Sequence, residues 1–260
     1  MMRTANPALN AQVFQQARGL SAGDVMTLQG TVNKTFILLA LLVISASWVW
    51  GKIVQPVPVY EGMEGVGQTV ASSAGPLMML GVFGGMIVGF LTIFKKEWAP
   101  MTAPVYAVLE GLFLGGLSAI FEVQYPGIVI QAVGLTFATL FCLLTAYKSG
   151  LIKPTENFKL GIVAATGAIA LIYFVTIILG FFHVSVPMIY GNGPIGIAFS
   201  LLVVTIAALN LVLDFDFIEQ GSTTGVPRYM EWYAAFGLIV TLVWLYIEIL
   251  RLLSKLRERR

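Results

Sequence analysis

Five acidic side chains fall within or at the edge of strongly apolar segments of the sequence. Asp214 and Asp216 lie near the end of one apolar run, and Glu110, Glu231 and Glu248 lie in three others. An ionised side chain at the centre of a bilayer costs about 3 kcal/mol or more, so acids kept at such positions are candidates for moving ions or protons. These carboxylates therefore predict a channel or an ion-translocating membrane protein.

The composition excludes a sizeable soluble domain. Hydrophobic residues make up 58% of the chain and charged residues 11%, with a mean hydropathy of +0.87. Soluble domains carry about 25% charged residues. The net charge of +2 is small, and the basic residues are dispersed between apolar runs, so we expect no nucleic-acid partner.

Seven apolar stretches are long enough to span a bilayer, which takes about 20 residues. They cover residues 36–54, 74–94, 103–121, 128–147, 160–182, 195–218 and 229–253. A lipid-exposed backbone must satisfy its own hydrogen bonds, so each stretch is expected to be helical. The prediction is an all-α integral membrane protein, with an N-terminal arm (1–30), a seven-helix domain (31–253) and a basic tail (254–260).

The positions of Lys and Arg predict that the N-terminus is cytoplasmic. That orientation places nine basic residues inside (Arg3, Arg18, Lys34, Lys95, Lys96, Lys148, Lys153, Lys159 and Arg228) and only Lys52 outside. The basic tail is an exception, because seven crossings would put it outside. Either the tail is translocated or the last segment is re-entrant and does not fully span.

Glycines recur every four residues in two of the runs. Gly81, Gly85 and Gly89 lie in the second run, and Gly111 and Gly115 in the third. Such spacing allows helix backbones to approach closely. We expect these two helices to pack tightly against neighbours within the chain.

Enzyme chemistry is not favoured by the residues available. Ser118 would need a histidine on a nearby helix to act as a protease nucleophile, but His183, the only histidine, is predicted to lie in a loop. An aspartyl protease motif, Gly-x-Gly-Asp, is absent. His183 has no second His or Cys near it for a zinc site, and the single cysteine, Cys142, is expected to lie in the apolar core. We predict no enzyme and no resident cofactor.

The two aspartates of the sixth run cannot face the same partner. They are two residues apart, which is about 200° around a helix. Asn210 precedes Asp214 by one turn and gives it a polar neighbour, whereas Asp216 is flanked by phenylalanines and lies nearer the helix end. Asp214 is therefore the favoured buried acid, with Asp216 as the alternative.

The turn between the sixth and seventh runs brings Glu231 to a depth similar to that of Asp214. Glu248 lies 17 residues after Glu231, roughly 25 Å further along a helix, where Arg251 could be its counter-charge. Carboxylates in contact at low dielectric share a proton. The pair Asp214 and Glu231 could therefore sense pH, although Glu231 could also simply accompany the aromatic residues of the membrane surface.

Three long stretches of the chain resemble the bacterial branch of the Bax inhibitor (TMBIM) family. They are PVYAVLEGLFLGGLSAIFE, NLVLDFDFIEQG and PRYMEWYAAFGLIVTLVWLYIEILRLLSKL, and the segment MTLQGTVNKT before the first run is also similar. The resemblance covers nearly the whole chain.

This resemblance implies a seven-helix bundle with the last helix at its centre and a pH-sensitive calcium leak. In the family a pair of aspartates, one in helix six and one in helix seven, controls opening. The first corresponds to Asp214, with Asp216 the less similar match. The seventh helix here has no aspartate, so the second corresponds to Glu231, in YMEW, or to Glu248, in IEILRLL.

Calcium is a hard cation that binds carboxylate and carbonyl oxygens. The acids Asp214, Asp216, Glu110 and Glu231 are expected in the cytoplasmic half of the membrane, with Glu110, Asp214 and Asp216 along an ion pathway. Asp214 and Asp216 would make only weak, transient calcium contacts, since a leak needs weak coordination. Glu110 could instead serve helix packing alone.

The same resemblance also agrees with a function of another class. The protein could be a non-channel regulator that binds a membrane protease or another quality-control partner. On either interpretation the expected surroundings are the lipid bilayer of the bacterial inner membrane.

The charge distribution generates a prediction about topology. A reporter fused at Ser149 should be cytoplasmic, because basic loops are retained on that side. A cysteine introduced at Ser254 should be labelled from outside the cell. Periplasmic exposure at Ser149 would contradict the predicted orientation, and labelling at Ser254 only from inside would favour a re-entrant last segment.

Overall fold

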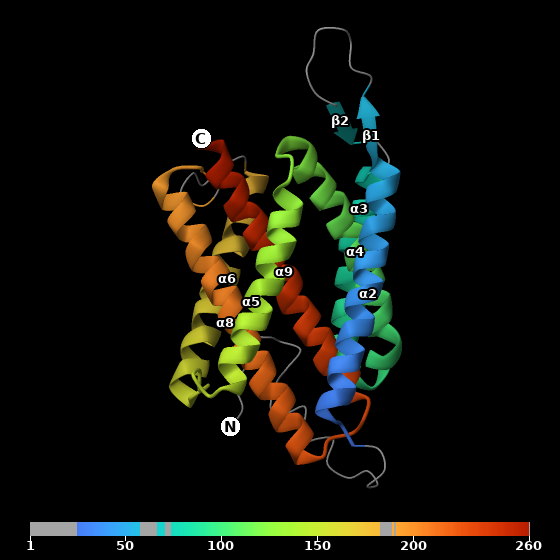
Figure 1. Cartoon of the computed structure of the whole chain (residues 1–260), viewed down its shortest axis with the longest axis vertical. Helices are drawn as coiled ribbons and strands as arrows, with labels where there is room; N and C mark the ends of the chain where they lie inside the picture. Colours follow the sequence, from blue (N-terminus) through green and yellow to red (C-terminus); the bar gives the residue numbers. More distant parts are fainter. Residues whose placement is uncertain (1–24, 58–66, 71–73, 183–188, 190, 260) are drawn as a thin grey trace.

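Within the part of the chain that the structure describes, seven long helices form a single bundle (Figure 1). The computed structural model describes residues 25–57, 67–70, 74–182, 189 and 191–259. The helices are α2 (Leu28–Ile53), α3 (Ala74–Phe94), α4 (Ala99–Gln124), α5 (Ile128–Lys148), α6 (Glu156–Phe181), α8 (Pro194–Thr224) and α9 (Met230–Glu258). The predicted all-α bundle with seven helices long and apolar enough to span a membrane is confirmed.

Successive helices run in opposite directions (Figure 1). We call the side on which α2 begins the N-terminal side and the other the opposite side. On the opposite side, β1 (Val54–Val57) and β2 (Gly67–Val70) form an antiparallel pair between α2 and α3. One short 3-10 helix, η1 (Lys96–Trp98), leads into α4 on the N-terminal side.

Most helices extend beyond the apolar runs that predicted them. The bounds of α3 agree with the predicted 74–94, whereas α2 begins at Leu28, eight residues before 36, and α8 continues to Thr224, six residues past 218. Pro194 is the first residue of α8, whereas Pro104 lies inside α4, because that helix already begins at Ala99. Hydropathy detects the part of a helix within hydrocarbon, and helices continue into the polar region of a bilayer.

The last helix crosses the whole bundle. α9 has 29 residues without interruption, about 44 Å at a rise of 1.5 Å per residue, which exceeds a hydrocarbon core of about 30 Å. Its end lies on the side opposite the start of α2 (Figure 1). The re-entrant alternative is therefore wrong. Much of the predicted tail belongs to α9, and Ser254 is buried, so exposed Leu256 is the better position for a labelling cysteine.

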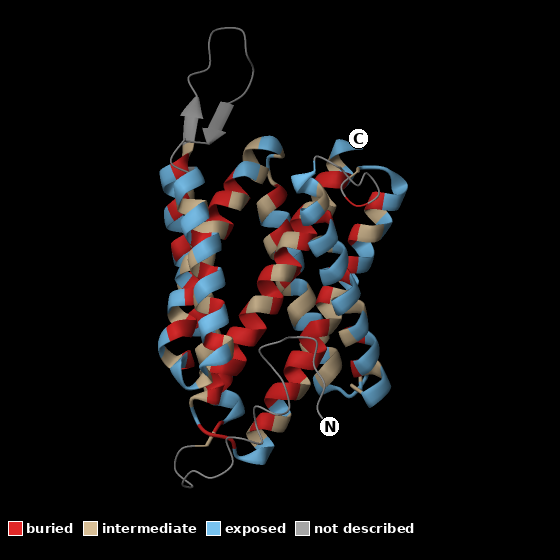
Figure 2. Ribbon diagram, turned by 180° about the vertical axis from the view of Figure 1, so that it is seen from behind, coloured by how far each residue is buried: buried red, intermediate tan, exposed pale blue. Residues whose placement is uncertain are grey.

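α9 lies at the centre of the bundle. It packs against α2, α4, α5 and α8, and a side chain of α6 reaches it through Tyr173. Figure 2 shows buried residues along almost its full length. Tyr233, Phe236, Ile239 and Leu245 of α9 are among the largest fully buried side chains. The central position of the last helix, implied by the resemblance, is confirmed.

Glycines bring α4 into close contact with two neighbours. A side chain on Gly115 would place its Cβ 2.5 Å from the carbonyl oxygen of Ala46 in α2, and one on Gly81 of α3 would meet the Phe113 backbone nitrogen at 2.6 Å. Ser45 Oγ donates to the Val108 carbonyl at 2.8 Å across the same α2–α4 contact. The glycine spacing thus serves helix packing within the chain, as predicted.

The outer surface of the bundle is rich in large apolar side chains. Phe83, Phe90, Phe174 and Phe181 are more than half exposed, which water would penalise and lipid tails would not. Cys142 is also exposed, so the expectation of a core cysteine is wrong. It lies on the face of α5 turned away from the bundle. These seven helices define an integral membrane protein.

The helix packing generates a prediction about stability. Gly115→Ala should lower the free energy of unfolding by about 1–3 kcal/mol, because the added methyl group meets rigid backbone. Gly134 on α5 has no atom within 4 Å of a built Cβ, so Gly134→Ala should leave stability unchanged or raise it by about 0.5–1 kcal/mol. Thermal unfolding in mild detergent would measure both variants. Equal effects of the two would show that the α2–α4 contact is not tightly packed.

Candidate functional site

Asp214 lies within α8 and is completely buried. Its neighbours along the helix, Leu213 and Phe215, are also buried. One turn earlier, the Asn210 amide donates to Thr166 Oγ1 of α6 at 2.9 Å, which joins α6 to α8 beside the acid. The prediction that Asp214 is the more buried of the two aspartates is confirmed.

Asp216 faces a different helix. Its carboxylate forms an ion pair with Lys159 of α6 at 2.7 Å and accepts a hydrogen bond from Gln220 Nε2 at 2.5 Å. The Asp216 side chain is 16% exposed. Lys159 is buried, and its Nζ also lies 3.5 Å from Glu156 Oε1. Asp216 thus has a nearby counter-charge in Lys159, whose place in the sequence indicates only the topology of the chain.

Glu231 lies in the first turn of α9 and is held by the beginning of α2. Its Oε1 accepts hydrogen bonds from the Thr27 backbone nitrogen at 2.8 Å and from Thr27 Oγ1 at 2.9 Å. Its Oε2 forms an ion pair with Lys34 Nζ. Thr27 is the N-cap of α2, where unpaired amide groups and the helix dipole favour a negative charge. The Glu231 carboxylate is therefore an electrostatic link between α2 and α9.

The backbone reinforces this link. Val25 forms an antiparallel bridge with Pro227, and the Met26 nitrogen donates to the Val226 carbonyl at 2.7 Å. α8 ends at Gly225, whose positive φ of 70° suits glycine and allows the chain to turn. The start of α2 and the turn between α8 and α9 therefore form one unit on the N-terminal side.

Glu110 lies at the interface of α4 with α3. It is partly buried, and its Oε2 would lie 3.1 Å from a Cβ built on Gly85. Its carboxylate interacts with the Tyr106 side chain one turn earlier. Tyr106 in turn packs edge-on against Phe236 of α9, with 4.8 Å between ring centroids. Through Tyr106, Glu110 is connected to the central helix.

Glu248 belongs to a separate polar group on the opposite side. Arg251 Nη1 lies 3.1 Å from its Oε1, which confirms the predicted ion pair. The Tyr173 hydroxyl of α6 donates to the same oxygen at 3.0 Å and accepts from Arg251 at 2.6 Å. The Glu248 carboxylate is buried and has partners from its own helix and from α6.

Lys255 is a buried cation, although the sequence predicted that it belongs to a basic tail. Its Nζ donates to the carbonyls of Ile189 and Gly196, at 2.5 and 3.1 Å, and to Ser200 Oγ at 2.9 Å. Gly196 and Ser200 belong to α8 and Ile189 precedes it, so Lys255 fastens the beginning of α8 to the end of α9. Its spacing of seven residues from Glu248, two helical turns, is the signal that could have placed it on the inward face.

No group of three or more His, Cys, Asp or Glu side chains that could hold a metal ion occurs among the residues that the structure describes. The weak calcium contacts predicted for Asp214 and Asp216 would therefore draw on carbonyl oxygens or water for further ligands. His183 lies outside the described residues.

The fold and the buried acids define the class: a seven-helix integral membrane protein with titratable groups inside the bundle. Comparison with known families matches residues 6–258 to the family described as Bax inhibitor 1 like. The chain belongs to this family. A search of curated proteins found no match to this chain.

The contacts of Glu231 generate a prediction about the α2–α9 link. Glu231→Gln keeps an oxygen for Thr27 but leaves Lys34 without its anion. We expect the free energy of unfolding to fall by about 2–3 kcal/mol. This is less than the ~3–5 kcal/mol lost when one partner of a fully buried ion pair is removed, because Lys34 retains some contact with water. Hydrogen exchange of the amides of residues 27–31 should become faster.

Gln29→Ala is the matched control. Gln29 lies on the same turn of α2 but bonds only Asn33 at the exposed surface, an interaction worth about 0.3 kcal/mol. Unchanged exchange in Glu231→Gln, or an equal change in the control, would show that Glu231 does not hold α2 in place.

Proposed function

We propose that the protein is a pH-sensitive cation leak channel, with calcium as a transported ion. Asp214 and Glu231 are the proposed pH-sensing pair, and Glu110, Asp214 and Asp216 lie along the proposed pathway. The observation that carries the proposal is the complete burial of Asp214 within a membrane-spanning helix. A carboxylate at such a position is costly and is retained where it serves translocation.

The packing of α8 against α9 supports Asp214 and Glu231 as the pair. The two helices contact each other extensively, and α8 extends further toward the N-terminal side than the start of α9 (Figure 1). Asp214 lies ten residues before Thr224, about 15 Å from the end of α8. That offset brings Asp214 toward the level of Glu231, in the first turn of α9.

The partners of Glu231 support a direction for the pH response. The ionised carboxylate attracts Lys34 and accepts two hydrogen bonds from Thr27. Protonation removes the charge that holds Lys34 and so loosens α2 from α9. On this proposal the link is closed at neutral pH, and flux rises as the pH falls.

The chemistry of the acids supports a cation as the transported ion. Asp214, Asp216 and Glu231 lie in the half of the bundle toward the N-terminal side, and their carboxylates suit a hard cation such as calcium. The charge count supports placing that side in the cytoplasm of a bacterial inner membrane. The proposed activity is transport and not catalysis.

The first test is calcium flux in liposomes that contain only the purified protein. We expect flux to rise as the pH is lowered from 8, and both Asp214→Asn and Glu231→Gln to flatten this dependence. The double variant should add little, because residues that act through one switch are not additive. Glu248→Gln, on the opposite side, is the matched control and should keep the pH response.

The same assay separates the proposal from a role as a regulator of a membrane protease. A leak needs no partner, so absence of flux in liposomes would contradict the channel. If Glu248→Gln, and not Glu231→Gln, abolished the pH response, the seventh-helix member of the pair would be Glu248.

Glu110 allows a separate test of the pathway. Glu110→Gln keeps the size of the side chain and its contacts with Tyr106 and Gly85 but removes the charge. We expect a reduction of cation flux by about tenfold, the effect of roughly 1.4 kcal/mol on the barrier for a cation. Normal folding with unchanged flux and unchanged pH dependence would show that Glu110 serves packing only.

A further inference from the structure

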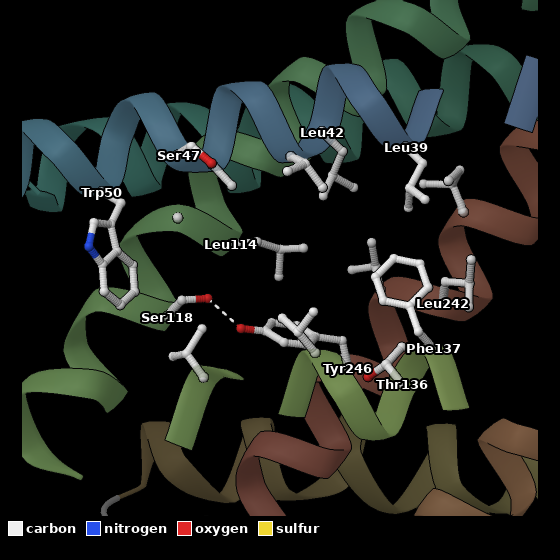
Figure 3. A pocket seen from close by; sticks show the side chains of 17 residues that line it. Leu39, Leu42, Ser47, Trp50, Leu114, Ser118, Thr136, Phe137, Leu242 and Tyr246 are labelled. Carbon is white, nitrogen blue, oxygen red and sulfur yellow. Dashed lines mark hydrogen bonds between the residues drawn. The ribbon is translucent and has the colours of Figure 1, made fainter. Parts of the chain in front are cut away.

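A cavity of about 440 Å³ lies among α2, α4, α5 and α9 (Figure 3). Its walls are mainly aliphatic and aromatic, with Leu42 from α2, Leu114 from α4, Phe137 from α5 and Leu242 from α9. These positions lie from the middle of the bundle toward the opposite side, whereas Asp214 and Glu231 lie toward the N-terminal side. None of the acids of the proposed channel lines the cavity.

Three polar side chains of the wall, Ser118, Thr136 and Tyr246, are hydrogen-bonded within the protein. Ser118 Oγ and the Tyr246 hydroxyl form a buried hydrogen bond of 2.6 Å with each other (Figure 3). Thr136 Oγ1 donates to the Ala132 carbonyl at 2.8 Å. A cavity lined in this way offers little to water or an ion, and apolar cavities instead bind apolar molecules.

The cavity is open on one side rather than enclosed. On α2, Val43 is 48% exposed and Ser47, one turn later, is also exposed, and both line the cavity. α2 packs mainly on α4 and α9, whereas α5 packs mainly on α9 and α8. In Figure 1, α9 is visible between α2 and α5. The opening therefore faces the hydrocarbon of the surrounding bilayer.

We propose that this cavity binds an acyl chain of a bilayer phospholipid. An apolar cavity of about 150 Å³ already accommodates benzene, and this one has almost three times that volume. The cavity ends at Trp50, next to exposed Trp48 and two residues before Lys52. Trp and Lys at a helix end mark the level of lipid headgroups, so a chain entering here would keep its phosphate near Lys52. The site is independent of the proposed leak.

Photo-crosslinking tests the site in the full-length protein. The protein is placed in nanodiscs of phosphatidylcholine that carries a photoreactive diazirine on one acyl chain, and labelled peptides are mapped by mass spectrometry. We expect labelling at Leu242 and Val243, which are only 5% and 8% exposed on the central helix. A lipid that remains outside the bundle would label the outer faces of the helices instead.

Filling the cavity should prevent this labelling. The double variant Val43→Trp, Val133→Trp places a large side chain at the rim and another on the α5 wall. The yield of photo-crosslinks on α9 should then fall by about tenfold, which corresponds to losing the burial of roughly two methylene groups of the acyl chain. Ile44→Trp combined with Leu135→Trp is the matched control, since both residues are exposed and neither lines the cavity. The control should keep the wild-type yield.

Two results would overturn the proposal. One is the absence of label on α9 in the wild-type protein. The other is an undiminished yield on α9 in the filled variant, whose folding is checked by its thermal unfolding. If the double variant does not fold, Val43→Trp alone, at the exposed rim, is compared with Ile44→Trp, and an equal yield on α9 in these two would likewise contradict the site.

Discussion

The cost of burying charge in hydrocarbon governs the arrangement of this bundle. The central helix α9 carries Glu231, Glu248 and Lys255, all nearly inaccessible. Each has partners that include a different neighbouring helix: α2 for Glu231, α6 for Glu248 and α8 for Lys255. An unpaired charge would cost several kcal/mol. The polar contacts therefore fix how the outer helices are attached to α9, while apolar packing fills the space between.

The attachments differ in the kind of partner that holds each charge. Lys255 binds neutral oxygens, and Glu248 has the permanent charge of Arg251 beside it. Glu231 is held by Lys34 and by the first amides of α2. That contact joins two helices at their ends, and it depends on one carboxylate remaining ionised. On the proposed mechanism, a change in protonation there would act on the position of an entire helix.

Buried charges occur toward both sides of the bundle, and the apolar cavity lies between other helices. Toward the N-terminal side, Lys159, Asp214 and Glu231 are buried. Toward the opposite side, Glu248 and Lys255 are buried, with partners on α6 and α8. The space among α2, α4, α5 and α9 is instead apolar and open on one side. Because Gly111 and Gly115 let α2 lie directly on α4, α2 lines this space as well as holding Glu231 through Lys34.

The sequence alone determined the membrane class, the seven helices and the greater burial of Asp214, because these follow from hydropathy and from helical spacing, which are local properties. The family resemblance added the central place of α9. Only the tertiary structure decided the partners of the charges: Lys34 for Glu231, Lys159 for Asp216 and the acceptors of Lys255. These pairs join residues far apart in the chain, so they depend on how the helices are rotated and packed, which no local pattern specifies.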